Sequence, residues 1–327
     1  MTERVIVCGG AGYVGSHAAR ALAAAGYLPV VVDSLSGGHA DAVQWGPLEQ
    51  LDIRETAALT AVMKAHAPVA VLHFAASIEV GIGEREPLAF YENNVAGTIS
   101  VLRAMTGAGV DRLVFSSTCA VYGAAAPPLT EEMPHRAGSV YGRTKSMVET
   151  IIADTARVQG LKAACLRYFN AAGAAPDGLT GERHDPETHL IPLALAAAAG
   201  RGQGLNVFGT DYDTPDGTAL RDYVHVCDLA DAHVAAVRWL AGADAGAHAF
   251  NLGTGEPLSV LQVMAAVQRA TGLAVPHTFG PRRPGDVPVL TADTSKARAA
   301  LGFAPRLSDI DTIVGTAWAF HRRQWGL

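Results

Sequence analysis

The sequence predicts the α/β class, with a doubly wound parallel sheet followed by a smaller α/β domain. Apolar runs of strand length alternate with amphipathic helix patterns up to about residue 170, and a glycine-rich turn follows the first run directly. Such alternation is typical of parallel strands joined by right-handed crossover helices. We therefore expect strands at residues 5–8, 28–33, 48–51, 69–74, 113–116 and 163–166.

The first expected strand leads into a group of spaced glycines. Gly10, Gly12 and Gly15 match G-x-G-x-x-G, and Gly9, Gly12 and Gly15 match G-x-x-G-x-x-G. These glycines permit a tight turn, close approach of the backbone to a pyrophosphate, and close packing of helix on strand. A helix expected at 13–25 then presents its N-terminus to the phosphates. The turn therefore predicts a Rossmann-like dinucleotide site.

Asp33, at the end of the second expected strand, indicates which dinucleotide binds. A carboxylate at this position accepts hydrogen bonds from the adenosine ribose hydroxyls and repels a 2′-phosphate. No Arg or Lys follows within residues 34–38. The sequence therefore predicts NAD, rather than NADP, as the cofactor.

Polar residues also follow other expected strands, at the carboxyl ends where doubly wound sheets bind ligands. They include Asp52, the turn at 74–77, and Ser116, Ser117 and Thr118. We expect Asp52 to reach the adenine and Thr118 to point toward the reacting centre. The residues alone are equally consistent with Ser117 and Thr118 bonding to local backbone in a turn.

Tyr141 and Lys145 are candidate catalytic residues because, four positions apart on a helix, they share one face. A phenol has a pKa of about 10, and lowering it to near 7 requires about 4 kcal/mol. One cation at about 5 Å supplies roughly 3 kcal/mol at an effective dielectric near 20. Lys145 alone therefore falls short, whereas Lys145 and a bound oxidised nicotinamide together suffice to make Tyr141 a base.

A change of composition after Asn170 predicts a second domain. Residues 171–222 are rich in Gly, Pro, Asp and Thr, with one clear helix expected at 191–199. A further helix, expected at 226–240, should pack back on the first domain. The expected domains are an NAD-binding domain of residues 1–170 plus about 221–247, and a substrate-binding domain of about 171–220 plus 248–327.

Composition narrows the classes of partner and compartment. A formal net charge of −6 without a basic block argues against nucleic acid. The apolar runs are shorter than a membrane span, and the N-terminus lacks a signal-peptide pattern. Cys8, Cys119, Cys165 and Cys227 are scattered beside apolar residues, which suits reduced thiols in a cytoplasmic protein. We expect neither disulfides nor a metal centre.

Several longer motifs extend these patterns over the chain. General ones are GGAGYVGSH at 9–17, HFAA at 73–76 and YGRTK at 141–145; more specific ones are LRYFN at 166–170, ETHLIP at 187–192 and DGTALRDYVHV at 216–226. With these motifs, the sequence from residue 5 to about 320 resembles the UDP-glucose/UDP-galactose 4-epimerases of the extended short-chain dehydrogenase/reductase family.

The resemblance implies an NAD-dependent isomerase acting at C4 of a UDP-sugar. Tyr141 would remove the 4-OH proton, and Lys145 would bind the nicotinamide ribose and lower the pKa of Tyr141. Thr118 would hydrogen-bond the 4-oxygen. Hydride would leave C4 for tightly bound NAD and return to the other face of the 4-keto sugar.

The resemblance also assigns the binding residues. Those expected to bind NAD are Gly9, Gly12, Tyr13, Val14, Asp33, Ser34, Asp52, Ile53, Phe74, Ala75, Ala76, Asn93, Ser116, Tyr141, Lys145 and Tyr168. Those expected to bind the UDP-sugar are Thr118, Tyr141, Phe169, Asn170, His189, Leu190, Leu205, Asn206, Phe208, Arg221, Tyr223, Arg283, Asp286 and Leu290. Arg221 and Arg283 would clamp the diphosphate; the alternative is that both form surface salt bridges.

Departures from the family pattern leave the sugar open. Ile78 stands where some relatives have Lys, which removes one cofactor contact, and His189 stands where many have Asn. Leu290 stands where relatives have Tyr or a small residue controlling the room around the sugar 2-position. Alternative substrates are therefore UDP-N-acetylhexosamines and the pentoses UDP-xylose and UDP-arabinose.

Other functions fit the sequence less well. A 4,6-dehydratase or a decarboxylase needs further acid–base groups, but Cys119 and Ala120 follow Thr118. Asp33 opposes a reductase that uses NADPH. A non-catalytic NAD-binding regulator would not need both Tyr141 and Lys145.

Two helices, expected near 93–105 and 140–155, indicate a homodimer. Around them, Phe90, Ile99, Met147 and Ile151 add apolar surface beyond what the sheet requires. By resemblance, they would pair across a two-fold axis. The alternative is simple packing on their own sheet.

Overall fold

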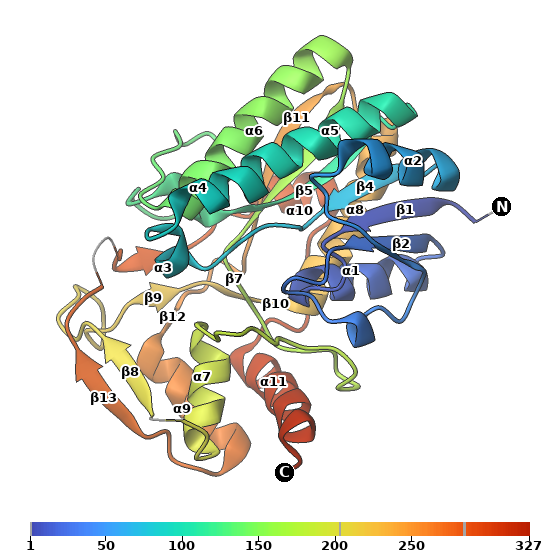
Figure 1. The fold of residues 1–327 in the computed structure, drawn as a ribbon. Coiled ribbons are helices and arrows are strands. Elements are labelled where there is room, and N and C mark those ends of the chain that lie inside the picture. The colour runs from blue at the N-terminus through green and yellow to red at the C-terminus, as the bar shows by residue number, and fades with distance from the viewer. Residues whose placement is uncertain (1, 203, 284–285) are drawn as a thin grey trace.

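Seven parallel strands form the central sheet, in the order β11-β6-β5-β4-β1-β2-β3 (Figure 1). The computed structural model describes residues 2–202, 204–283 and 286–327. The sheet strands are β1 (Arg4–Cys8), β2 (Leu28–Asp33), β3 (Leu48–Gln50), β4 (Ala70–His73), β5 (Arg112–Thr118), β6 (Lys162–Tyr168) and β11 (Gly246–Leu252). The order runs outward in both directions from β1 and β4, so the carboxyl ends of these two central strands border a crevice.

Helices cover both faces of this sheet. The helices against one face are α2 (Thr56–His66), α5 (Gly97–Ala108) and α6 (Val140–Gln159), and those against the other are α1 (Tyr13–Ala24), α8 (Val226–Gly242) and α10 (Ser295–Leu301). Each set closes a continuous apolar core on the buried strands. These two cores, with parallel strands between them, confirm the predicted fold class.

The smaller unit is built from short strands and three helices. Its helices are α7 (Leu190–Ala198), α9 (Val260–Thr271) and α11 (Ile310–Trp325), which share one apolar core. Its strands pair as β8 (Leu205–Phe208) with β13 (His277–Gly280), and as β12 (Leu258–Ser259), β9 (Leu220–Arg221) and β14 (Val289–Leu290). In Figure 1 this unit lies beside the carboxyl-terminal edge of the large sheet, below α3 and α4.

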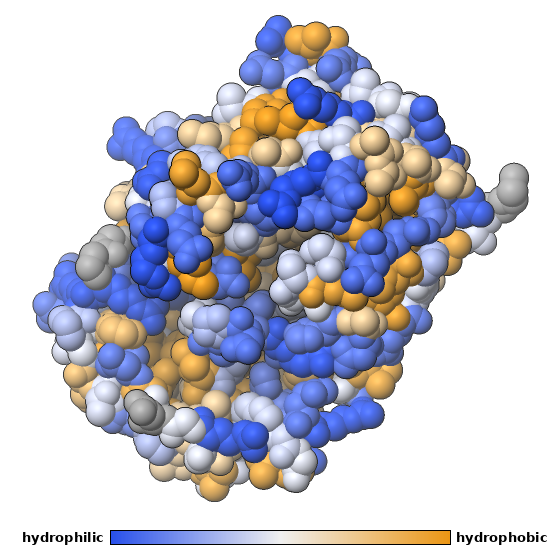
Figure 2. Space-filling model, in the orientation of Figure 1, coloured by the Kyte–Doolittle hydropathy of each residue, from blue (hydrophilic) through white to orange (hydrophobic). Residues whose placement is uncertain are grey.

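Short segments connect the two units. The pair β7 (Asn170–Ala172) and β10 (Tyr223–His225) runs between them. The large unit also contains short helical segments, which are η1 (Ala40–Ala42), α3 (Val80–Gly83), α4 (Pro87–Phe90), the π-helical η2 (Tyr91–Ala96) and η3 (Cys119–Tyr122). Figure 2 shows the same face of the molecule hollowed between the large and the small unit.

The boundary expected near residue 247 falls inside a strand. β11 pairs with β6 through Leu252, and α10 packs on α8 and β11 through the buried Ala297. Part of the sequence assigned to the substrate domain therefore belongs to the large sheet unit. Among the described residues, the structure contains no helix with the length and apolar character of a membrane span.

Candidate active site

The glycine turn after β1 brings three backbone segments into contact. Gly9 has a φ of +80°, and a Cβ there would lie 2.5 Å from the backbone nitrogen of Ala75. A Cβ on Gly15 would lie 2.2 Å from the carbonyl oxygen of Gly9. Gly12, before the first turn of α1, has no side chain to cap the helix. The free N–H groups of this helix N-terminus suit the phosphates of a dinucleotide.

Asp33 stands at the end of β2, beside this turn, and is buried. Its Oδ2 accepts a hydrogen bond from the backbone of Ala11 at 2.9 Å, and its Oδ1 accepts one from Leu35 at 2.8 Å. These bonds fix the carboxylate at the wall of the cavity. Its negative charge there fits a ribose with free hydroxyls better than one carrying a 2′-phosphate.

Asp33→Ala is expected to shift the ratio of the NADP and NAD dissociation constants toward NADP by about fivefold or more. The change removes a charge repulsion worth roughly 1 kcal/mol even in water-like surroundings. Fluorescence titration of cofactor-free protein measures both constants. Asp41→Ala is the control, because Asp41 is exposed and paired with Arg183. An unchanged ratio in Asp33→Ala would contradict the role given to Asp33.

Asp52 follows β3 and contacts an arginine in the structure. Arg54 donates to both Asp52 oxygens, at 2.6 to 3.1 Å. Both residues line the same cavity as Asp33. The expected contact of Asp52 with adenine would therefore involve a carboxylate that is already shared with a guanidinium.

Tyr141 and Lys145 lie on the first turns of α6. Ser139 caps the N-terminus of this helix, since its Oγ accepts a hydrogen bond from the backbone of Gly142 at 3.1 Å. Lys145 Nζ donates to the carbonyl oxygen of Ser116 at 2.8 Å and lies 5.9 Å from the centre of the Tyr141 ring. The predicted pair on one helix face is thus present, and β5 provides a fixed partner for the lysine.

Burial dominates the electrostatics of this pair. It lowers the pKa of Lys145 to about 7, although the charge of Glu149 opposes the change. It also raises the pKa of Tyr141 above its ordinary value, an effect that a hydrogen bond with Thr118 only partly offsets. The lowering of the Tyr141 pKa expected from the sequence is therefore not found with the protein's own groups.

Residues at the end of β5 have separate roles. Thr118 lines the cavity, and its Oγ1 also accepts a hydrogen bond from the backbone of Ala120 at 3.1 Å, which caps η3. Ser117 points into the core, where its hydroxyl donates to Glu149. Ser116 is hydrogen-bonded through its hydroxyl to that of Tyr168. Thr118 therefore faces the cavity and also bonds to local backbone, whereas Ser117 is buried away from the cavity and has a structural role.

One cavity of about 620 Å³ collects the residues expected to bind the cofactor. Its lining includes Gly9, Gly12, Tyr13, Val14, Asp33, Ser34, Asp52, Ile53, Phe74, Ala75, Ala76, Asn93, Ser116, Tyr141, Lys145 and Tyr168. The cavity thus joins the glycine turn to the Tyr141–Lys145 pair. Because a Cβ on Gly9 or Gly15 would fill the turn and Asp33 faces the space beyond it, these residues fit NAD.

Only some of the residues expected to bind substrate line this cavity. Those that do are Thr118, Tyr141, Phe169, Asn170 and His189, whereas Leu190, Leu205, Asn206, Phe208, Arg221, Tyr223, Arg283, Asp286 and Leu290 lie outside it. Most of the second set belongs to the smaller unit. Tyr223 is buried in β10 beside Asn170 of β7, and Leu190 begins α7.

The charged residues of the second set contact one another or aromatic rings. Arg221, on β9, is hydrogen-bonded to Asp286, another residue expected to bind the UDP-sugar. The Arg283 guanidinium lies 4.2 Å from the centre of the Phe208 ring. Arg221 is mostly buried, with 13% of its side chain exposed, so it is not an ordinary surface salt-bridge residue.

Leu290 connects the smaller unit to the candidate catalytic residues. It lies on β14 opposite Arg221 of β9 and packs against a buried cluster that contains Cys119 and Phe169. Cys119 directly follows Thr118, and Phe169 lines the cavity. Leu290 therefore packs against two residues that adjoin the candidate reacting centre.

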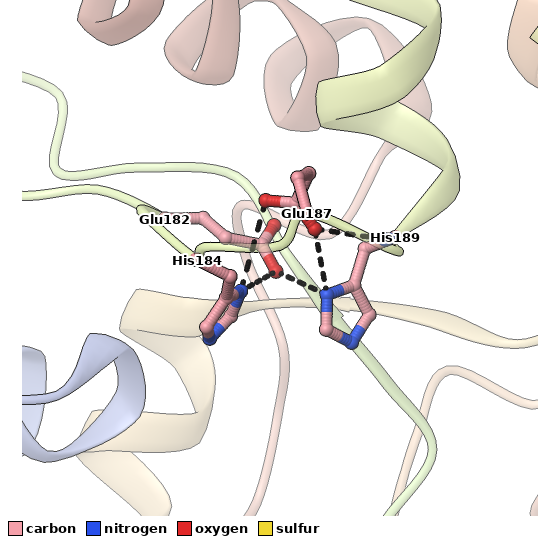
Figure 3. Close-up of side chains that lie close together, drawn as sticks. All are labelled: Glu182, His184, Glu187 and His189. Atoms are coloured by element: carbon pink, nitrogen blue, oxygen red, sulfur yellow. Dashed lines mark hydrogen bonds and ion pairs between the residues drawn. The ribbon is translucent and has the colours of Figure 1, made fainter. Parts of the chain in front are cut away.

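Two acidic and two imidazole side chains gather on the loop before α7 (Figure 3). Although burial would lower the pKa values of the histidines, the neighbouring carboxylates of Glu182 and Glu187 raise the pKa of His184 to about 9 and that of His189 to about 10. Only His189 was expected from the sequence. The spacing E-x-H-x-x-E-x-H indicates the other three, Glu182, His184 and Glu187, but it was not used to predict them.

A buried ion pair below Lys145 was also missed. Arg167, at the end of β6, donates to both oxygens of Glu149 on α6, at 2.5 to 3.2 Å. It also donates to the Tyr122 hydroxyl at 2.9 Å. Glu149 follows Lys145 by one helical turn, so Tyr141, Lys145 and Glu149 share one face of α6.

Comparison with known proteins agrees with this geometry. A model of the NAD dependent epimerase/dehydratase family matches residues 5–253. A UDP-glucose 4-epimerase of Rhizobium leguminosarum bv. trifolii is 49% identical over 323 residues, which cover 98% of each chain.

Two solved structures superimpose on nearly the whole chain. The UDP-glucose 4-epimerase of Brucella ovis in complex with NAD is 49% identical, with a TM-score of 0.95 over 98% of each chain. That of Stenotrophomonas maltophila, with bound NAD and formylated UDP-arabinopyranose, is 40% identical, with a TM-score of 0.96 over 100% of this chain and 99% of its own. The chain therefore belongs to the NAD dependent epimerase/dehydratase family.

Proposed function

We propose that this protein interconverts UDP-glucose and UDP-galactose by inverting C4 of the sugar, through a 4-keto intermediate and with NAD held throughout. The observation that carries this function is the cavity that joins the glycine turn and Asp33 to Thr118, Tyr141 and Lys145. The names of the relatives support the same reaction. The mechanism uses residues that contact this cavity.

Tyr141 takes and returns the proton of the sugar 4-hydroxyl. NAD, when bound, supplies the hydride acceptor and donor. Burial raises the pKa of Tyr141, so the phenolate requires a positive charge that the protein alone does not provide. Tyr141 and Lys145 line the cavity that would hold NAD, and an oxidised nicotinamide there would add a positive charge that favours the phenolate.

Lys145 and Thr118 hold the reacting groups in place. Lys145 is anchored on the Ser116 carbonyl oxygen, from where we propose that it binds the nicotinamide ribose. Thr118, fixed by its bond to the backbone of Ala120, donates to the sugar 4-oxygen. One group thus orients the cofactor and the other the sugar 4-oxygen, which limits how the two reactants can approach each other.

The smaller unit holds the UDP half of the substrate. We assign the diphosphate to Arg221 and Arg283, the uridine ribose to Asp286 and the uracil to β8, with its Leu205, Asn206 and Phe208. Asn170 and His189 would contact the sugar and diphosphate. Guanidinium groups form strong bidentate hydrogen bonds to phosphate oxygens, which supports the assignment. Arg221 must then bind the diphosphate while it remains paired with Asp286.

Leu290→Tyr is expected to lower kcat/KM for UDP-N-acetylglucosamine about tenfold more than for UDP-glucose. The larger ring would push on the Phe169 cluster and reduce the room around the sugar 2-position. Pocket discrimination of this size is worth roughly 1–3 kcal/mol. Leu290→Met, which preserves volume, is the control. Proportional changes for both substrates would refute the gate.

A substrate panel tests the function itself. The purified protein is first checked for NAD by its absorbance, then incubated with UDP-hexoses, UDP-N-acetylhexosamines and UDP-pentoses. Fastest conversion of UDP-galactose supports the proposal. Faster conversion of UDP-arabinose or UDP-xylose would favour a pentose epimerase, for which the arabinose-containing ligand of the Stenotrophomonas relative is an argument. Bound NAD with every UDP-sugar unchanged would favour a regulator.

We also propose a homodimer in the cytoplasm. Two apolar residues of α6, Met147 and Val158, have exposed fractions of 46% and 69%, which supports pairing through this helix. All four cysteines are free, as in proteins of reducing compartments. Sedimentation equilibrium tests the dimer, and a monomer at micromolar concentration would refute it.

A further inference from the structure

The loop from Glu182 to His189, which precedes α7, brings four potential metal ligands to one point (Figure 3). One ligand atom of each of Glu182, His184, Glu187 and His189 lies within 4.8 Å of all the others. Both imidazole rings turn Nδ1 toward the carboxylates and Nε2 away from them (Figure 3). The four side chains therefore converge on a common centre.

The separations between these atoms fit a small tetrahedral site. His189 Nδ1 lies 2.9 Å from Glu182 Oε1 and 3.1 Å from Glu187 Oε1. His184 Nδ1 lies 3.3 Å from Glu182 Oε1 and 3.7 Å from Glu187 Oε2. Zinc bonds of about 2.0–2.2 Å in a tetrahedron place neighbouring ligands about 3.3–3.6 Å apart. The four measured separations, from 2.9 to 3.7 Å, lie on both sides of that spacing.

A second observation comes from hydrogen bonding. His184 Nδ1 is fully buried and has no hydrogen-bond partner within the described part of the chain, although two carboxylates lie near it. Glu182 is also buried, with 5% of its side chain exposed. His184 Nδ1 therefore forms an ion-pair contact with Glu182 at 3.3 Å that lacks the geometry of a hydrogen bond. A cation between them would satisfy both.

The ligand types indicate which cation. Two imidazole nitrogens with two carboxylate oxygens suit zinc or another divalent transition metal. Magnesium and calcium prefer oxygen ligands alone. A divalent ion also balances the charges of the two glutamates. Two protons on the histidines balance them as well, so the experiment must distinguish a metal from protons.

We propose that Glu182, His184, Glu187 and His189 bind one divalent transition-metal ion, with zinc the best match. Because all four ligands come from the protein, the site is structural. Glu182, His184 and His189 also line the cofactor cavity, and the ring edge of Tyr13 lies against His184. The metal therefore fixes this wall of the cavity against α1, and it takes no part in hydride or proton transfer.

Zinc binding to the NAD-loaded protein tests the site. Protein stripped with a chelator is titrated with zinc sulfate or magnesium chloride, and bound metal is measured by calorimetry and elemental analysis. We expect one zinc per chain and no competition by magnesium. Cobalt in place of zinc should give the intense visible absorption of a tetrahedral site.

Variants of two ligands complete the test. Glu187→Gln keeps an oxygen that accepts the backbone bonds of Thr188 and His189, so the loop should fold, and His184→Asn gives a second, independent loss. Each should weaken zinc binding at least about a hundredfold. Glu49→Gln is the control, since Glu49 pairs with His66 at 2.7 Å in the same way but outside the cluster. No stoichiometric zinc in the unmodified protein, or equal affinity in folded Glu187→Gln, would show that protons alone hold the cluster.

Discussion

Tyr141→Phe is expected to lower the turnover of UDP-galactose at least about a hundredfold while leaving NAD bound. Phenylalanine preserves the packing of the ring but removes the group that exchanges the 4-hydroxyl proton, and general acid–base catalysis typically contributes this much or more. Turnover is measured by separating UDP-glucose from UDP-galactose, and bound NAD by absorbance after denaturation.

Tyr27→Phe is the control for this prediction. Tyr27 packs at the edge of the core under α1, away from the cavity, so removing its hydroxyl should leave turnover unchanged. A normal rate in Tyr141→Phe would mean that another group is the base. Loss of NAD together with turnover would mean that the hydroxyl serves cofactor binding instead.

Glu149→Ala is expected to reduce the free energy of unfolding by about 3–5 kcal/mol. The change leaves the guanidinium of Arg167 buried without its counter-charge, since only 6% of that side chain is exposed. It also removes the carboxylate that accepts the hydrogen bond of Ser117, and whose negative charge favours protonated Lys145. Urea denaturation measures the loss.

Asp154→Ala provides a matched comparison on the same helix. Asp154 pairs with Arg157, but both side chains are mostly exposed, and such pairs contribute at most about 1 kcal/mol. If Glu149→Ala and Asp154→Ala reduce the free energy of unfolding equally, burial does not make the Glu149–Arg167 pair more important for stability. If Glu149→Ala is too unstable to purify, Glu149→Gln keeps the shape and should show a smaller loss in the same direction.

Local patterns explain why much of the fold could be predicted. β1, the glycine turn, α1 and Asp33 follow one another within about thirty residues, and each has a local signal. The Tyr141–Lys145 pair needs only helical periodicity. The family fold then follows from alternation of strands and helices.

Features that depend on tertiary packing could not be predicted in this way. β11 was divided by the expected domain boundary, because its pairing with β6 depends on residues far away in the sequence. The Glu149–Arg167 pair joins a helix to a strand, and the sequence does not show which charges become buried together. The expected pKa of Tyr141 considered nearby charges but not desolvation, which proved larger.

The fate of the hydrogen on C4 tests the central claim most directly. UDP-galactose carrying deuterium at C4 is converted in ordinary water by the NAD-loaded protein, and the product is examined by mass spectrometry and nuclear magnetic resonance. Transfer to NAD and back predicts that UDP-glucose keeps the deuterium at C4, with no NADH released. Loss of the deuterium to water would contradict a hydride transfer and point to removal of the C4 hydrogen as a proton.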